Sequence, residues 1–272
     1  MKRLELTLGA APVGALDLSP LLPAALAELS LDRIRRFKLR HGTRSSALGD
    51  LFAVNGEPGG ALALRGITPG CFGVGHGMNG GIIEISGHGG QELGREMRAG
   101  EIRVRGHAGD GLALGLRGGL VRVKGNAGAR LGGAVPGSVH GMNGGVVIVD
   151  GSIGERGAER MRRGLVIVGD ATGPYLADRM VAGTVIVFGE AGDHAGLGMR
   201  RGTLLLAQAP RELPATFNPC GRFELTFVSV LSRHVAEFDR PYARALRSFD
   251  WVERWCGDMA HGGKGEILLA QG

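Results

Sequence analysis

The chain repeats one pattern every 19 residues through its central part. The units open at Gly81, Gly100, Gly119, Gly145, Gly164, Gly183 and Gly202, and one seven-residue insertion lengthens a single step to 26. A second column keeps the same register: Met78, Met97, Leu116, Met142, Met161, Met180 and Met199. A fixed period of this kind is typical of a solenoid, in which each unit buries its apolar face by stacking on its neighbours.

The residues after each opening glycine alternate in the manner of a β-strand. Their second and fourth positions are aliphatic throughout: Ile83/Ile85, Ile102/Val104, Val121/Val123, Val147/Val149, Val166/Val168, Val185/Val187 and Leu204/Leu206. Such alternation between glycine turns predicts parallel strands stacked coil on coil, with these side chains and the methionine column inside. We therefore expect an all-β chain, built as a parallel β-helix of seven glycine-rich coils with short α/β caps.

The segments outside the repeat differ from it in composition. We expect an N-terminal cap over residues 1–47, the glycine-rich β-helix over 48–208 and a C-terminal extension over 209–272. In the cap, the pattern predicts strands at Arg3–Leu8 and at 34–39 and a helix from Ser19-Pro20 to Leu29. In the extension, apolar spacing predicts an amphipathic helix over 241–256, whose shared face is Tyr242, Leu246, Phe249, Val252 and Trp255.

Composition narrows the location and the ligand class. The three cysteines, Cys71, Cys220 and Cys256, form no CxxC motif, so neither a disulfide framework nor a zinc or iron–sulfur site is indicated. The N-terminus does not have the pattern of a signal peptide and no apolar run is long enough to span a bilayer, which favours the cytoplasm. The net charge of +6 suggests nucleic acid, but only 5% of residues are aromatic and acidic residues are interspersed, so we expect none.

The sequence contains no constellation that indicates catalysis or a metal. There is no GxSxG, GxxxxGK[ST], HxH or HExxH motif, so no catalytic residue and no metal ligand is predicted. Two copies of HGMNGG, at 76–81 and 140–145, lie three coils apart, too far for their histidines to share one metal. They are typical of turns, and the alternative is a small-anion site formed by backbone N–H groups.

Two surface features remain as candidate sites. Arg103, Arg105, Arg122 and Lys124 form a basic patch on adjacent coils, which is either a solvated face or an anion-binding strip. The outward third positions of the later strands form an aliphatic ladder of Ile148, Ile167, Ile186 and Leu205. An exposed ladder of this kind marks a partner interface or a surface that the chain's own C-terminal helix covers, and we expect the interface.

The repeat unit also resembles a known family. The unit G-x-x-M-x-x-G-x-[IV]-x-[IV]-x-G is complete at 94–106, and together with GDLFAVNG at 49–56 it resembles the C-type subunit of formylmethanofuran dehydrogenase. It is similar to the gamma subunit of the bacterial formyltransferase/hydrolase complex and to the C-terminal domain of the glutamate synthase large subunit. The pattern departs at Leu116, at Ala113, Val139, Ala158 and Ala177 in place of the leading glycine, and at the closing glycine, where Gly169 comes one residue early and Gln208 replaces the last.

The resemblance implies a scaffold subunit that is not itself catalytic. In that family, formyl groups pass between tetrahydromethanopterin and a methanofuran-type carrier, during formaldehyde oxidation to formate, and the chemistry belongs to a formyltransferase and an amidohydrolase-like metal subunit. The carrier, tetrahydromethanopterin and the catalytic metal are thus implied for the complex, with no cofactor on this chain. Because the carriers bear glutamate-rich tails, the basic patch is a candidate tether. The alternatives are the C-type subunit of a methanogen-type molybdenum or tungsten formylmethanofuran dehydrogenase, favoured less by the arginine-rich composition, a glutamate synthase-like scaffold domain, and a β-helical acyltransferase.

Overall fold

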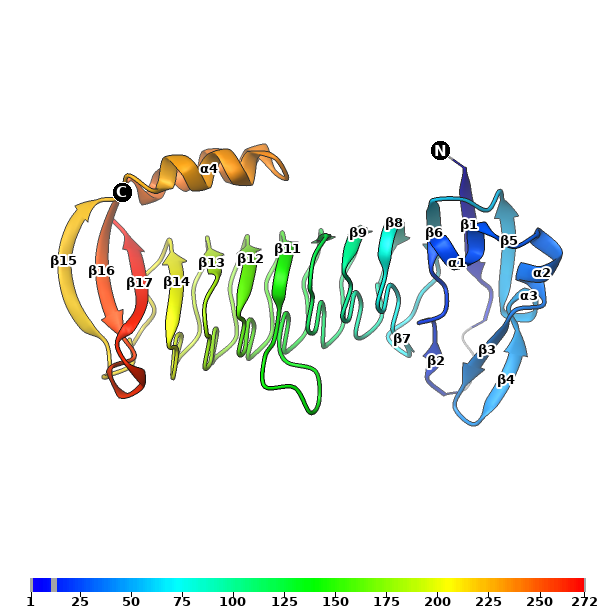
Figure 1. The fold of residues 1–272 in the computed structure, drawn as a ribbon, viewed down its shortest axis with the longest axis horizontal. Helices are drawn as coiled ribbons and strands as arrows, with labels where there is room; N and C mark the ends of the chain where they lie inside the picture. Colours follow the sequence, from blue (N-terminus) through cyan, green and yellow to red (C-terminus); the bar gives the residue numbers. More distant parts are fainter. Residues whose placement is uncertain (1, 11–13, 272) are drawn as a thin grey trace.

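Strands stacked along one axis form the body of the molecule (Figure 1). The computed structural model describes residues 2–10 and 14–271. A 13-stranded sheet runs in the order β15-β16-β17-β14-β13-β12-β11-β10-β9-β8-β6-β1-β5. The strands of the repeat are β8 (Asn79–Ser86), β9 (Ala99–Val104), β10 (Leu120–Val123), β11 (Asn143–Val149), β12 (Arg163–Val168), β13 (Thr184–Val187) and β14 (Arg201–Leu206). Each pairs in parallel with the next, so the predicted strands and their order are confirmed.

The register of the pairing follows the 19-residue period. Ile83 pairs with Ile102, and Ile102 with Val121, so equivalent side chains stack in columns. All fourteen aliphatic residues predicted to face inward are at most 1% exposed, and the methionine column is equally buried. These columns form one continuous apolar core, which confirms the inward assignment.

Glycine at the start of each strand is required by close packing as well as by backbone conformation. Gly100 has φ of +99°, and a Cβ at this position would lie 2.6 Å from the carbonyl oxygen of Gly81 and 2.5 Å from Cε of Met78. Both approaches are shorter than real Cβ contacts allow, and the φ value is one that side-chain-bearing residues rarely adopt. The glycine and methionine columns therefore depend on each other, because the methionine fills the space that the glycine of the next coil leaves open.

Both ends of the sheet finish in antiparallel strands. At the N-terminal end, β1 (Arg3–Leu8) lies between β5 (Phe52–Gly56) and β6 (Ala61–Arg65). At the C-terminal end, β17 (Lys264–Ala270) adds in parallel to β14, and β16 (Trp251–Gly257) and β15 (Asn218–Glu224) follow in antiparallel order. A second sheet, β4-β3-β2-β7, contains β2 (Leu16–Asp17), β3 (Lys38–His41), β4 (Arg44–Ala47) and β7 (Cys71–Phe72).

The helices are short, and several differ from the prediction. Residues 1–47 contain α1 (Pro23–Ala27) and α2 (Leu31–Arg35), and α3 (Leu48–Leu51) follows directly. The predicted strand at Arg3–Leu8 is confirmed as β1, and the helix expected from Ser19-Pro20 to Leu29 is shorter, as α1. The expected strand at 34–39 is wrong in its first half, which belongs to α2. There, the Ser30 side chain caps α2 by accepting a hydrogen bond from the backbone N–H of Arg33 at 3.4 Å. Among the described residues, none of the helices has the length and apolarity needed to cross a bilayer.

The C-terminal extension contains one helix that was not predicted and a shorter version of the one that was. The unpredicted helix is α4 (Val228–Ala236); the predicted helix over 241–256 is only α5 (Arg240–Ala245) with the 3₁₀ turn η1 (Leu246–Phe249). The helix prediction is wrong for Val252 and Trp255, which lie in β16 and pair with β17. Valine and tryptophan favour strands, and pairing with β17 at the end of the sheet outweighs the helical spacing of the apolar residues.

We predict that Gly100→Ala destabilises the protein by at least about 2 kcal/mol, because backbone strain and overpacking each cost about 1–3 kcal/mol. Gly77→Ala is the matched control, since Gly77 also has positive φ, +65°, but open space around its Cβ position. Chemical denaturation of both variants measures the difference. Equal losses of stability would contradict the close-packing role of Gly100.

Candidate binding surface

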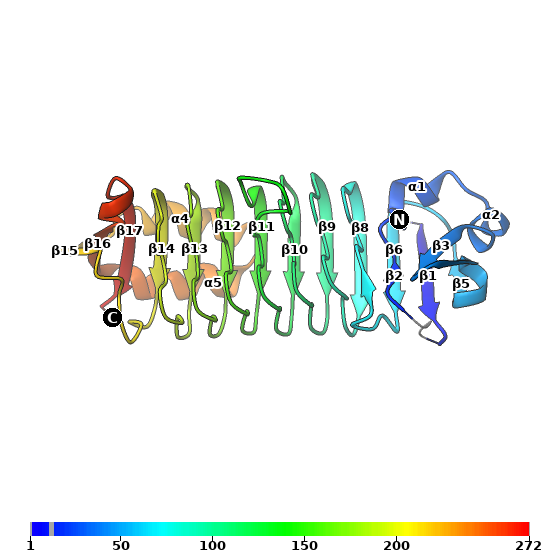
Figure 2. The same cartoon turned by 90° about the horizontal axis from the view of Figure 1, so that it is seen from below.

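The aliphatic ladder does not form an exposed interface. Ile148, Ile167, Ile186 and Leu205 are all 0% exposed. They lie in a second apolar cluster with residues of α4, α5 and η1, including Val228, Leu231, Val235, Leu246 and Phe249. Figures 1 and 2 show these helices lying along one side of the stack, over β11 to β14. The expected partner interface is therefore wrong at these positions, and the alternative, cover by the chain's own C-terminal segment, is what the structure shows.

The spacing of apolar residues explains why α4 takes this place. Val228, Leu231 and Val235 recur at three and four residues, which places them on one face of the helix, and all three are buried. Phe227, directly before α4, and Val230 within it are about half exposed, at 48% and 52%. With strands β11 to β13 the helix borders an apolar groove of about 540 Å³, into which Leu165 and His234 also face.

The predicted basic patch is divided between two sets of ion pairs. Arg103 binds Glu101 through Nε and Nη2, at 2.6 and 2.7 Å, and approaches Glu84 at 3.4 Å. Glu84 also pairs with Arg3 of β1 at 2.8 Å. Hydrogen bonds to Glu101 raise the pKa of Arg103 above its ordinary value. Arg105 is exposed, and within the described part of the chain no carboxylate lies at ion-pair distance from it.

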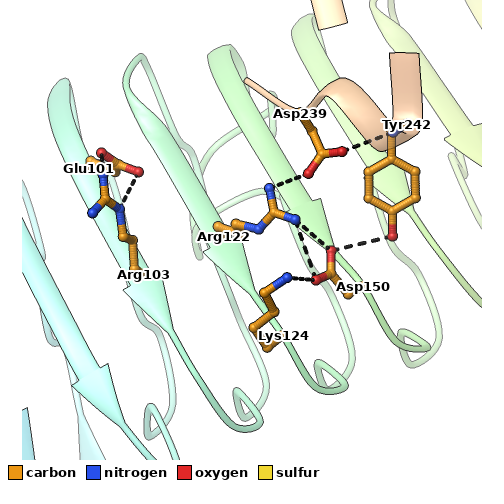
Figure 3. A network of polar contacts seen from close by, with 7 residues as sticks. All are labelled: Glu101, Arg103, Arg122, Lys124, Asp150, Asp239 and Tyr242. Atoms are coloured by element: carbon orange, nitrogen blue, oxygen red, sulfur yellow. Dashed lines mark hydrogen bonds and ion pairs between the residues drawn. The ribbon is translucent and has the colours of Figure 1, made fainter. Parts of the chain in front are cut away.

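Arg122 and Lys124 form the second set, which joins the coils to the cover (Figure 3). Lys124 Nζ lies 2.6 Å from Oδ2 of Asp150, and Arg122 Nη2 lies 3.2 Å from its Oδ1. Arg122 also pairs through Nη1 with Asp239, whose side chain is 5% exposed. Burial alone would lower the pKa of Arg122, but the two carboxylates outweigh it and raise the pKa. The four cations are thus not one uncompensated patch.

Asp239 and Tyr242 link this network to the start of α5. Asp239 is the N-cap residue of α5 and accepts a hydrogen bond from the backbone N–H of Tyr242 at 2.9 Å. The Tyr242 hydroxyl donates to Asp150 Oδ1 at 3.3 Å, and its ring stacks on Phe188 with centroids 5.2 Å apart. Burial, followed by the charge of Asp150, raises the pKa of Tyr242 to about 12.

The position of Tyr242 explains why the closing glycine of the fifth unit, Gly169, comes one residue early. A Cβ at Gly169 would lie 2.2 Å from the Tyr242 hydroxyl and 2.4 Å from the carbonyl oxygen of Asp150. The position is occupied by Asp150 one coil earlier and by Phe188 one coil later, and both contact Tyr242. Tyr242 therefore lies against the same position on three successive coils, occupied by Asp150, Gly169 and Phe188. We did not predict Asp150, Asp239 or Gly169 as site residues, although the displaced glycine was a visible signal.

The HGMNGG segments lead into β8 and β11, and the last three residues of each belong to the strand. His76 and Gly77 lie in a turn, as predicted, whereas residues 140–142 lie in irregular structure. His76 Nε2 is 3.6 Å from Glu96, whereas the His140 ring nitrogen Nδ1 is buried without a hydrogen-bond partner among the residues that the structure describes. Within that same part of the chain, no three His, Cys, Asp or Glu side chains converge as a metal site requires. The ion pairs of this surface hold neighbouring segments in position. Its exposed charged groups are cationic side chains, which suit an anion and not a metal ion.

We predict that Tyr242 titrates near pH 12 in the folded protein, against about 10 for the free side chain. Because the raised pKa favours the neutral phenol, its contribution to stability is complete below pH 10 and disappears as the pH rises through 12. Absorbance titration in a Tyr175→Phe background isolates Tyr242. Adding Asp150→Asn should bring the pKa back toward 10, and an unchanged titration would show that Asp150 does not act on Tyr242.

Comparison with known proteins places this architecture in a family. The sequence model of the GXGXG motif family matches residues 72–221. A chain in the crystal structure of the formyltransferase/hydrolase complex (FhcABCD) from Methylorubrum extorquens, determined in complex with methylofuran, superposes with a TM-score of 0.91 at 33% identity. The match covers 98% of this chain and 100% of that one. A comparison with curated proteins finds no match. The chain therefore belongs to the GXGXG motif family, and it is a relative of that chain of the formyltransferase/hydrolase complex.

Proposed function

We propose that this chain is a non-catalytic scaffold subunit of a formyltransferase/hydrolase complex, of the gamma or C type. The observation that carries the proposal is the match along the whole chain, with a TM-score of 0.91, to one chain of such a complex. Because the likeness includes both ends and not only the repeat, it extends to the caps and the helical cover. The partners are then a formyltransferase and an amidohydrolase-like subunit, in the cytoplasm.

We also infer the architecture of the chain and the pathway in which it takes part. The seven coils are interpreted as a parallel β-helix over 48–208, with 1–47 as cap and 209–272 as extension. The pathway is formyl transfer between tetrahydromethanopterin and a methanofuran-type carrier, in formaldehyde oxidation to formate, with the metal on another subunit. That the related complex was crystallised with methylofuran supports the carrier class. A methanogen-type dehydrogenase subunit and a glutamate synthase-like domain are the competing assignments.

Partner contact is proposed for the outer side of the cover, because the ladder lies beneath it. The groove beside α4 is apolar and carries Phe227 and Val230 at its rim, about half exposed. Apolar side chains gathered on a surface are typical of protein interfaces. We therefore propose that the contact with another subunit lies on α4 and not on the predicted ladder.

A part in carrier handling is also proposed for the basic patch, in a narrower form. Arg122 and Lys124 share Asp150 with the cover, so their first role is to hold α5 in place. Arg105 remains for an anionic carrier tail, since its side chain is exposed, and beside it Arg103 is exposed although it holds Glu101 and Glu84. Attraction of this kind is screened over about 8–10 Å at physiological ionic strength, so it should weaken with salt.

The test is to purify the tagged chain from its source and identify the co-purifying chains by mass spectrometry. We predict a formyltransferase and an amidohydrolase-like chain, and no formyl transfer or hydrolysis by this chain alone. Glutamate synthase domains as partners, or turnover by the isolated chain, would contradict the proposal. In the same complex, Arg103→Ser with Arg105→Ser should reduce carrier retention in a salt-dependent manner, and unchanged retention would remove the patch from that role.

A further inference from the structure

Two of the three cysteines lie on neighbouring strands at the C-terminal end of the sheet. Cys220 belongs to β15 and Cys256 to β16, and the two strands pair in antiparallel order. Both residues are free thiols; Cys220 is exposed and Cys256 is half-buried. The third thiol, Cys71 in β7, is 1% exposed. A pair of thiols on adjacent strands can form a disulfide where the backbone brings the two sulfur atoms together.

The register of β15 against β16 turns these two side chains toward one another. Asn218 lies directly opposite Cys256, and Cys220 follows two residues later, which places it on the same face. The pairing is irregular between Pro219 and Arg222, where β15 contains one residue more than β16, and such a bulge bends a strand. Sγ of Cys220 lies 3.5 Å from the carbonyl oxygen of Asn218, so the thiol points back toward the residue that faces Cys256.

Packing beside the pair holds these ends of the two strands close together. Phe217, directly before β15, is 3% exposed, and a Cβ at Gly257 would lie 2.5 Å from Cγ of its ring. Only glycine allows the ring to lie this close to β16. The thiols also interact directly, because burial, followed by a hydrogen bond with Cys220, raises the pKa of Cys256. The two sulfur atoms are therefore neighbours.

A link at this point would act on a strand that is otherwise held along one edge. β15 is the last strand in the order of the sheet, and six of its seven residues are exposed, so little apolar burial holds it in place. Pro219 has no backbone N–H to donate to the ladder. Yet β15 leads directly into the helical cover, since Leu225 lies in the second apolar cluster and α4 begins at Val228.

We propose that Cys220 and Cys256 form a reversible disulfide, with hydrogen peroxide as the oxidant, and that this bond fastens β15 and the start of the cover to the sheet. The Cys220 sulfur attacks the peroxide and the O–O bond breaks, which gives a sulfenic acid and one water molecule. The Cys256 sulfur then attacks the Cys220 sulfur, the S–O bond breaks, and a second water molecule leaves as the S–S bond forms. In total the two thiols lose two protons and two electrons, and the peroxide becomes two water molecules.

Exposure and protonation determine the order of attack. Cys220 is exposed, so peroxide reaches it first. The raised pKa of Cys256 keeps its sulfur protonated and slows direct oxidation, since the thiolate is the reactive form. Monothiols or dithiols reverse the bond by exchange through a mixed disulfide. This inference rests on the C-terminal strands and not on the proposed complex, so either can fail alone.

The test oxidises the full chain with hydrogen peroxide, alkylates the remaining thiols with iodoacetamide after unfolding, and identifies linked peptides by mass spectrometry. We predict an intramolecular link between Cys220 and Cys256 that disappears with dithiothreitol, while Cys71 is recovered as an alkylated thiol. The oxidised chain should melt several degrees higher than the reduced chain, because the cross-link restricts the unfolded state. Cys220→Ser is the matched control, and its melting temperature should not change on oxidation.

Single variants test the roles of the two thiols. In Cys256→Ser the sulfenic acid on Cys220 has no thiol beside it to react with, so dimedone should label Cys220 after a short exposure to peroxide. In Cys220→Ser, Cys256 should remain a thiol under the same exposure. Melting curves of the reduced variants verify that both are folded.

Three results would overturn the proposal. Separate sulfinic acids on the two residues, or a link between two copies of the chain, would show that the sulfur atoms do not meet within one chain. A disulfide that leaves the melting temperature unchanged would show that it does not fasten β15. Dimedone labelling of Cys256 in preference to Cys220 would reverse the assigned roles.

Discussion

Stacking of equivalent residues every 19 positions is the constraint on which the rest of this structure depends. Parallel pairing in strict register brings each valine or isoleucine onto its counterpart one coil away, as with Ile102 and Val121. The glycine that opens each strand and the methionine before it are coupled by the same spacing, since Met78 occupies the space beside Gly100. A substitution in one coil therefore disturbs the packing of the neighbouring coils, because no coil has an apolar core of its own.

Departures from the regular stack mark the positions where other parts of the chain pack against it or where its surface changes. The ladder from Ile148 to Leu205 requires a cover, which α4, α5 and η1 provide. Gly169 stands one residue early because Tyr242 occupies the space above it. The coil at 180–183 replaces two arginines by valine and alanine and so forms the floor of a hollow between charged coils. The insertion before β11 lies at the wall of a neighbouring hollow.

The sequence predicted the repeating part well and the ends less well, for physical reasons. The strands and their inward columns follow from a local pattern repeated seven times, and the methionine column belongs to the same core. Val252 and Trp255 have helical spacing but form a strand, because β17 offers them hydrogen-bond partners. The exposure of the ladder could not be decided from residues 148 to 205 alone, since its cover comes from 228 to 249. The partners of Arg122 are likewise distant in sequence, as Asp239 shows.

The most direct test of the stacking account is a comparison of two deletions that remove most of the second strand of the repeat and the turns that follow it. Removing residues 101–119 takes out 19 residues and joins Gly100 to Leu120, so β10 should stack on β8 with every inward side chain still inside. Removing residues 102–119 takes out 18 and shifts the register by one, which turns Val121 and Val123 outward. Thermal melts followed by circular dichroism should show a cooperative transition for the first protein and none for the second. Equally cooperative melts for both would contradict the dependence of the fold on its period.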